Sequence, residues 1–215
     1  MKKISPKILS SLVVALSFSV GAANAATLTF DELAPAAAGA EVPAGYGGLN
    51  WSAFAYLTPS LSTIRPGYAH GTVSQSNVAF NTFANPATFS STSLFTLIDA
   101  YFTAAWNDGL NIHVVASADG NVVQTKDFIV DTSAPSDILF NWSNINSVTI
   151  SSSGGTPVIF SGVGTHFAMD NLTIAQPLAM TQDESTPAVP EPETYAMLLA
   201  GLGALGLVAR RRKST

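Results

Sequence analysis

LNIHVVAS, residues Leu110 to Ser117, alternates apolar and polar side chains, and a second run with apolar ends, Val122 to Val130, follows after Asp119-Gly120. Alternation with a period of two predicts strands that bury one face. Asp-Gly between two such runs predicts a tight hairpin turn, because glycine tolerates positive φ. The pair therefore predicts antiparallel pairing.

The same type of pattern recurs along the chain without a sustained helical period. Runs of strand character lie at residues 27–30, 49–57, 77–83, 95–106, 136–142, 147–151, 158–160 and 167–174. Short strands separated by Gly, Asn and Ser are typical of an all-β domain, and about nine of them fit an antiparallel β-sandwich of the jelly-roll type.

The first 25 residues predict a secretory signal peptide. Lysines precede an apolar stretch, and Ala23-Asn24-Ala25 forms an A-x-A cleavage site, so the mature chain is expected to begin at Ala26. Export of this kind implies the Sec machinery as a partner. The β-sandwich domain is expected at residues 26–175, followed by a linker rich in proline and acidic residues at 176–189.

The C-terminal 190–213 segment has three parts in order. Pro190-Glu191-Pro192 comes first, an uncharged apolar run at 194–209 follows, and the basic residues 210–213 close it. The prolines prevent a helix from starting before residue 193. Sixteen helical residues would extend roughly 24 Å, a minimal transmembrane helix with its basic end in the cytoplasm.

Charge separates the domain from its ends. Of the nine Lys and Arg residues, only Arg65 and Lys126 lie between residues 26 and 186, against twelve of the fourteen Asp and Glu residues. The resulting net charge of about −10 excludes nucleic acid and anionic lipid as natural partners. No cysteine is present, so disulfides cannot stabilise the exported domain.

The tail resembles the PEP-CTERM sorting signal in all three parts. This resemblance implies recognition by an exosortase-type membrane protease through Pro190, Glu191 and Pro192, with the cluster Arg210, Arg211 and Arg212 retained on the cytoplasmic side. It also implies a Gram-negative bacterium that makes exopolysaccharide. The protein would be anchored in the membrane until it is processed, and would then lie at the cell surface or in the extracellular matrix.

A second resemblance covers the domain. The stretches at 67–81, 100–114 and 164–174 look like parts of many exported proteins with PEP-CTERM tails. The aromatic residue followed by Asp170-Asn171 in the last run is similar to the last strand of galactose-binding-like and carbohydrate-binding jelly rolls. The resemblance implies fold more than ligand.

A structural calcium ion is the first candidate ligand. In such jelly rolls the first and last strands lie side by side, which would bring Asp31 and Glu32 near Asp170 and Asn171. Their oxygens are ligands that Ca²⁺ prefers. Turn capping by the same side chains is the equally weighted alternative.

A glycan-binding surface is the second candidate. Trp106, Asn107 and Asp108 lie at a predicted turn and Tyr46 in a glycine-rich loop, where Tyr46, Asn107 and Asp108 are expected to be exposed. Large aromatic residues are more often part of a core, which is the competing interpretation.

No catalytic residue is predicted. His70, His113 and His166 lack metal-binding spacing, no G-x-S-x-G motif occurs, and no pair of carboxylates stands out. The sequence therefore favours a non-enzymatic surface or matrix protein associated with exopolysaccharide. A secreted polysaccharide-active enzyme and a ligand-free structural spacer are the alternatives.

Overall fold

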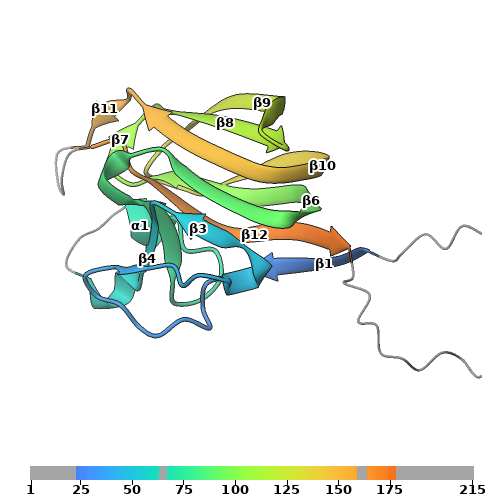
Figure 1. The fold of residues 1–215 in the computed structure, drawn as a ribbon. Coiled ribbons are helices and arrows are strands. Elements are labelled where there is room, and N and C mark those ends of the chain that lie inside the picture. The colour runs from blue at the N-terminus through green and yellow to red at the C-terminus, as the bar shows by residue number, and fades with distance from the viewer. Residues whose placement is uncertain (1–22, 63–66, 159–163, 178–215) are drawn as a thin grey trace, which may run out of the picture. The chain divides into compact units, whose positions relative to one another are not determined.

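The computed structural model describes residues 23–62, 67–158 and 164–177, and nearly all of its regular structure is strand (Figure 1). The strands are β1 (Ala23–Leu28), β2 (Ala40–Glu41), β3 (Asn50–Ser52), β4 (Phe54–Leu57), β5 (Val78–Asn81), β6 (Ala87–Ala104), β7 (Asn107–Asp108), β8 (Leu110–Ala118), β9 (Asn121–Val130), β10 (Ser136–Ser153), β11 (Thr156–Pro157) and β12 (Phe167–Pro177). Three single-turn 3₁₀ helices, η1 (Tyr46–Gly48), η2 (Pro59–Leu61) and η3 (Thr82–Ala84), and one short helix, α1 (Gly67–His70), connect them.

All strand pairs are antiparallel. The main sheet has the order β2-β4-β5-β12-β6-β10-β8-β9, with β1 beside β12 and β3 beside β6, while β7 and β11 form a separate pair. The predicted hairpin is confirmed, since β8 and β9 pair through a turn in which Asp119 has φ 50° and Gly120 has φ 81°. Buried and exposed residues alternate along β8, as its sequence indicates.

The sheet folds over a shared core to give the β-sandwich. Phe102 on β6 contacts Phe128 on β9 at a ring-centroid distance of 5.2 Å, although β10 and β8 separate these strands in the sheet order. Phe54 on β4 likewise contacts Phe89 on β6 at 6.3 Å. Full burial of a phenylalanine stabilises a fold by about 1.5–3 kcal/mol. Phe54, Phe89 and Phe102 are buried, so these contacts hold the two layers together. The all-β sandwich prediction is thus confirmed.

Several predicted strands have different limits. Residues 49–57 form two strands, because Ala53 adopts φ 57° between β3 and β4. Residues 136–142 and 147–151 belong to the single strand β10, whose register shifts twice between 139 and 145, where Asn141 and Asn144 have positive φ. These bulges bend a long strand without ending it.

The remaining differences lie at strand ends. Strand β6 begins at Ala87, eight residues before the prediction, and Phe83 leaves the predicted 77–83 strand for η3. Of the predicted 158–160 strand, Val158 lies outside any strand, and residues 159 and 160 lie outside the described residues. The two-residue strands β2, β7 and β11 were too short to predict.

Both predicted domain boundaries fall inside strands. Ala23, Ala25 and Ala26 lie in β1, where Ala23 pairs with Pro177 and Ala26 with Ile174 of β12. Cleavage before Ala26 would remove three residues of β1 and leave Ala26 to Leu28 paired. The cleavage site stays a prediction.

Candidate functional sites

Asp170 lies on β12 with no exposed surface. Its Oδ2 accepts hydrogen bonds from the backbone N–H of Val73 (2.7 Å) and Ser74 (2.9 Å), and its Oδ1 accepts from the backbone N–H of Asn171 (2.7 Å). The Ser74 hydroxyl donates to the same carboxyl at 3.1 Å. Burial raises the pKa of Asp170, and these hydrogen bonds oppose the rise. The carboxyl therefore fixes the start of the segment before β5.

Asp31 fixes the other end of that segment. Its Oδ1 accepts a hydrogen bond from the backbone N–H of Asn77 at 3.0 Å. The buried Asn77 side chain donates to the carbonyls of Phe30 (2.8 Å) and Leu33 (3.0 Å). Residues 71–77, named here the clamped loop, are thus bound by two of the four residues predicted to hold calcium.

The fit to calcium is incomplete. The named oxygens of Asp31 and Asp170 accept N–H donors, and Glu32 accepts a hydrogen bond from the Tyr46 hydroxyl. The buried Oδ1 of Asn171 has no hydrogen-bond partner, which leaves one oxygen free for an ion. Within residues 23–62, 67–158 and 164–177, no group of three or more His, Asp or Glu side chains could hold a metal ion. The arrangement matches turn capping, and calcium binding stays a prediction.

Tyr46 is half-buried rather than fully exposed as predicted. Its ring packs on Phe30 at a centroid distance of 5.4 Å, and its hydroxyl accepts a hydrogen bond from the Phe30 N–H and donates to Glu32, both at 2.8 Å. Burial, aided by the hydrogen bond to Glu32, raises the pKa of the Tyr46 phenol well above its ordinary value. Tyr46 therefore holds the residues that follow β1 in place. A half-buried ring whose hydroxyl is already hydrogen-bonded is poorly suited to stack on a sugar.

The turn at Trp106 is more buried than its sequence suggested. Trp106 is buried and meets Tyr68 edge-on at 5.5 Å, in a small satellite core. Asn107 was expected to be exposed but is buried, and its Nδ2 donates to the carbonyl of Gly154 at 2.9 Å. Asp108 is exposed as predicted, and its Oδ1 accepts hydrogen bonds from the backbone and hydroxyl of Thr132. These hydrogen bonds lower the pKa of Asp108.

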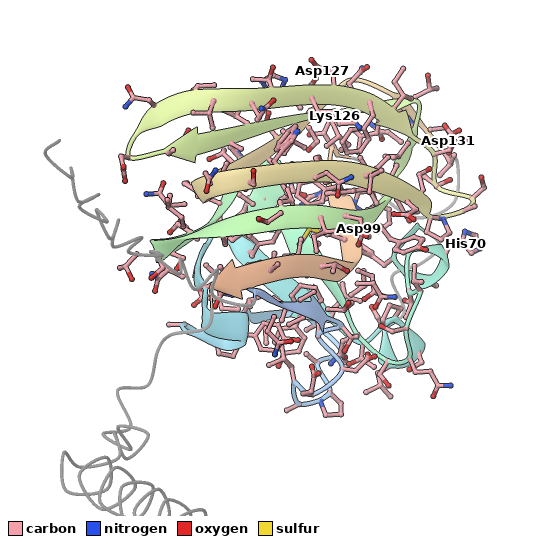
Figure 2. The ribbon with its side chains drawn as sticks, turned by 90° about the vertical axis from the view of Figure 1, so that its right-hand side faces the viewer. His70, Asp99, Lys126, Asp127 and Asp131 are labelled. Atoms are coloured by element: carbon pink, nitrogen blue, oxygen red, sulfur yellow. The ribbon has the colours of Figure 1, made fainter. Side chains whose placement is uncertain are left out.

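The three histidines lie in different parts of the domain. His70 Nδ1 lies 2.7 Å from the carbonyl oxygen of Thr132, and His113 Nδ1 lies 2.6 Å from Asp127 on the exposed side of β8 and β9. Figure 2 shows His70 and Asp127 apart from each other, with Asp99 on a further strand. His166 is half-buried, and burial lowers its pKa. Only one of the three lies against a carboxylate among the described residues: His113 and Asp127 form an exposed pair on the surface of the β8–β9 hairpin.

Sequence reasoning missed a cavity beside Phe83. It has a volume of about 380 Å³ and is lined by Ala38, Gly39, Ala40, Glu41, Ala55, Phe80, Thr82, Phe83 and His166. A larger cavity of about 550 Å³ lies along residues 59–60, 69 and 72–76, where neither an aromatic nor a titratable side chain lines it. The smaller cavity combines aromatic, hydroxyl, carboxylate and imidazole groups and is the better candidate for binding.

Residues 188–213 match the PEP-CTERM protein-sorting motif. The tail carries a PEP-CTERM sorting signal. This motif implies export, anchoring in the membrane and processing by an exosortase. The residues predicted to act in sorting, Pro190 to Pro192 and Arg210 to Arg212, lie outside the described residues, as does the predicted 194–209 helix.

Among the residues that the structure describes, no helix is both long and apolar enough to cross a membrane. A search of curated proteins found no match. Among solved structures, the domain is similar to that of TmCBM61 in complex with β-1,4-galactotriose, with 9% sequence identity, a TM-score of 0.34, and coverage of 60% of this chain and 88% of that chain.

Proposed function

We propose that this protein is an exported, non-enzymatic protein of the cell surface or extracellular matrix that associates with exopolysaccharide. The observation that carries the proposal is the match of residues 188–213 to the sorting motif. Sec-dependent export would deliver the chain, and an exosortase would release it from its anchor. The acidic domain would then face outward on the side where neutral polysaccharide lies.

The architecture of the domain supports display rather than catalysis. Two of its buried polar residues, Asp170 and Asn77, form hydrogen bonds that fix the backbone of neighbouring segments. A hydrolase of polysaccharide would need two facing carboxylates at a cleft. Among the described residues that line the better candidate cavity, Glu41 is the one carboxylate.

The sorting step is tested by changing Pro190, Glu191 and Pro192 together to alanine in the producing organism. We expect an unprocessed precursor that stays in the membrane fraction, because the element that the exosortase reads is lost. Pro187→Ala, just before the matched motif, is the control and should mature normally. Normal maturation of the triple variant would contradict the proposal.

The domain's role is tested with the full-length protein in mild detergent, incubated with the producer's exopolysaccharide. Retention without release of new reducing ends supports a binding protein. Release of reducing ends would favour a polysaccharide-active enzyme, and the absence of both retention and release would favour a structural spacer.

A further inference from the structure

Phe83 is displayed to solvent at a high conformational cost. Its side chain is 86% exposed, the most exposed of the large apolar residues that the structure describes. Its backbone has φ 53°, and the next residue, Ala84, has φ 55°. The left-handed region costs roughly 1–2 kcal/mol for a residue with a side chain. Burial of the ring cannot offset this cost, so the conformation has no explanation in the core.

The turn is nevertheless firmly anchored. The N–H of Thr82 donates to the carbonyl of Ala53 at 2.9 Å, and the N–H of Asn85 donates to the carbonyl of Thr82 at 3.0 Å. Asn81 is fully buried, accepts a hydrogen bond from the N–H of Phe167 at 2.9 Å, and donates to the carbonyl of Asn85 at 3.2 Å. The backbone that carries the aromatic ring is therefore fixed in advance, which lowers the entropic cost of binding a ligand.

The cavity beside this ring offers polar groups. Its volume of about 380 Å³ lies within the range typical of ligand sites. Thr82, Glu41 and His166, which carry a hydroxyl, a carboxyl and an imidazole, belong to its lining. Nδ1 of His166 is buried and has no hydrogen-bond partner in the part of the chain that the structure describes. This nitrogen lies beside Gly164 and has almost no accessible surface, so a ligand in the cavity would meet other atoms of the ring.

The imidazole is suited to a neutral ligand. Because burial lowers its pKa, His166 is neutral at physiological pH and can either donate or accept a hydrogen bond through its ring nitrogens. Glu41 is exposed at the rim and supplies an acceptor while repelling anions. Phe80 lines the cavity at a centroid distance of 6.4 Å from the His166 ring.

We infer that the Phe83 cavity binds one sugar unit of a neutral polysaccharide. A pyranose ring has an apolar C–H face that stacks on an aromatic ring and a rim of hydroxyls that pair with groups such as Thr82, Glu41 and His166. The small residues Ala38 and Gly39 leave room for the ring. Glu41 and the acidic domain disfavour uronic acids. The inference rests on the proposed function and deepens it by naming the binding site.

The test uses affinity electrophoresis of the full-length protein in mild detergent, through gels that contain galactan, xylan, mannan, β-glucan or the producer's own exopolysaccharide. Polygalacturonate serves as the anionic comparison. We expect at least one neutral polysaccharide to retard the protein, and Phe83→Ala to weaken that retardation about tenfold or more. Phe83→Trp should preserve it, because the aromatic face remains.

Leu139→Ala is the matched control, since Leu139 is an exposed apolar residue on β10 outside the cavity lining. It should leave the retardation unchanged. Equal retardation of wild type and Phe83→Ala would overturn the site while leaving exopolysaccharide association intact. Retardation by polygalacturonate alone would also overturn the site, and so would the absence of retardation by every polysaccharide. Binding to an octyl resin without retardation by any polysaccharide would indicate a nonspecific apolar surface and would overturn the site too. If no polysaccharide retards the protein but the tail is processed normally, the binding role of the domain is wrong and the sorting role of the tail stands.

Discussion

The two segments that flank β5 differ in how their side chains are used. The clamped loop before it, residues 71–77, is held by the carboxyls of Asp170 and Asp31. The turn after it, residues 82–85, places the exposed ring of Phe83 on left-handed backbone beside a cavity. In the first segment the hydrogen bonds fix the backbone to buried carboxyls, while the second carries a side chain that the core does not cover. Satisfied buried groups indicate stability, whereas strain with exposure indicates function.

The clamped loop should show the largest effect on stability. Asp170→Ala removes the acceptor of the Val73 and Ser74 N–H groups and should lower the free energy of unfolding by about 2–4 kcal/mol. Chemical denaturation of the full-length protein measures this change. Asp137→Ala, at an exposed acid on β10, should stay within about 0.5 kcal/mol. A loss below 1 kcal/mol for Asp170→Ala would show that the loop holds without its clamp.

The anchor of the Phe83 turn should have the next largest effect. Asn81→Ala removes the acceptor of the Phe167 N–H and should cost about 1–3 kcal/mol, because that donor is left buried. It should also weaken retardation by polysaccharide, since the turn loses its hold on Asn85. The control is Asn85→Ala, which keeps the main-chain carbonyl that Asn81 contacts. Unchanged binding by Asn81→Ala would show that the ring needs no anchor.

Asp108 should show the smallest effect, visible only in acid. Its hydrogen bonds from Thr132 lower its pKa below the ordinary 3.8, so its contribution is complete above that pH and is lost as the pH falls through the lower value. Asp108→Asn should therefore lose less stability than wild type between pH 5 and pH 3. Thr132→Val, which removes one of the two hydrogen bonds, should fall between them. Identical acid profiles for all three proteins would contradict this role.

Local pattern was enough to predict the regular parts of the fold. The β8–β9 hairpin follows from alternation around Asp119-Gly120, since both signals act within a few residues. Strand β10 was divided in the prediction because residues 143–146 resemble a turn, whereas Asn141 and Asn144 form bulges within one strand. Bulges depend on the neighbouring strands, which a single segment does not reveal.

The candidate site was harder to predict because its determinants are distant in sequence. The pattern placed Phe83 in a strand, but hydrogen bonds involving Ala53 and Phe167 fix the turn in the folded chain. Tyr46 was expected in an exposed loop, yet Phe30 and Glu32 hold its hydroxyl. The nearby signal available was the pair Asn81 and Asn85 around Phe83, since asparagine favours turns. The sorting tail, by contrast, is a linear motif and was predicted from sequence alone.

One variant tests most directly whether Phe83 is kept for binding rather than for stability. Phe83→Gly removes the ring and relieves the left-handed backbone at φ 53°. The free energy of unfolding and the retardation by neutral polysaccharide should both be measured on the full-length protein. We predict that the protein becomes more stable by about 1 kcal/mol while its retardation is lost. A less stable protein that is still retarded to the wild-type extent would contradict the account.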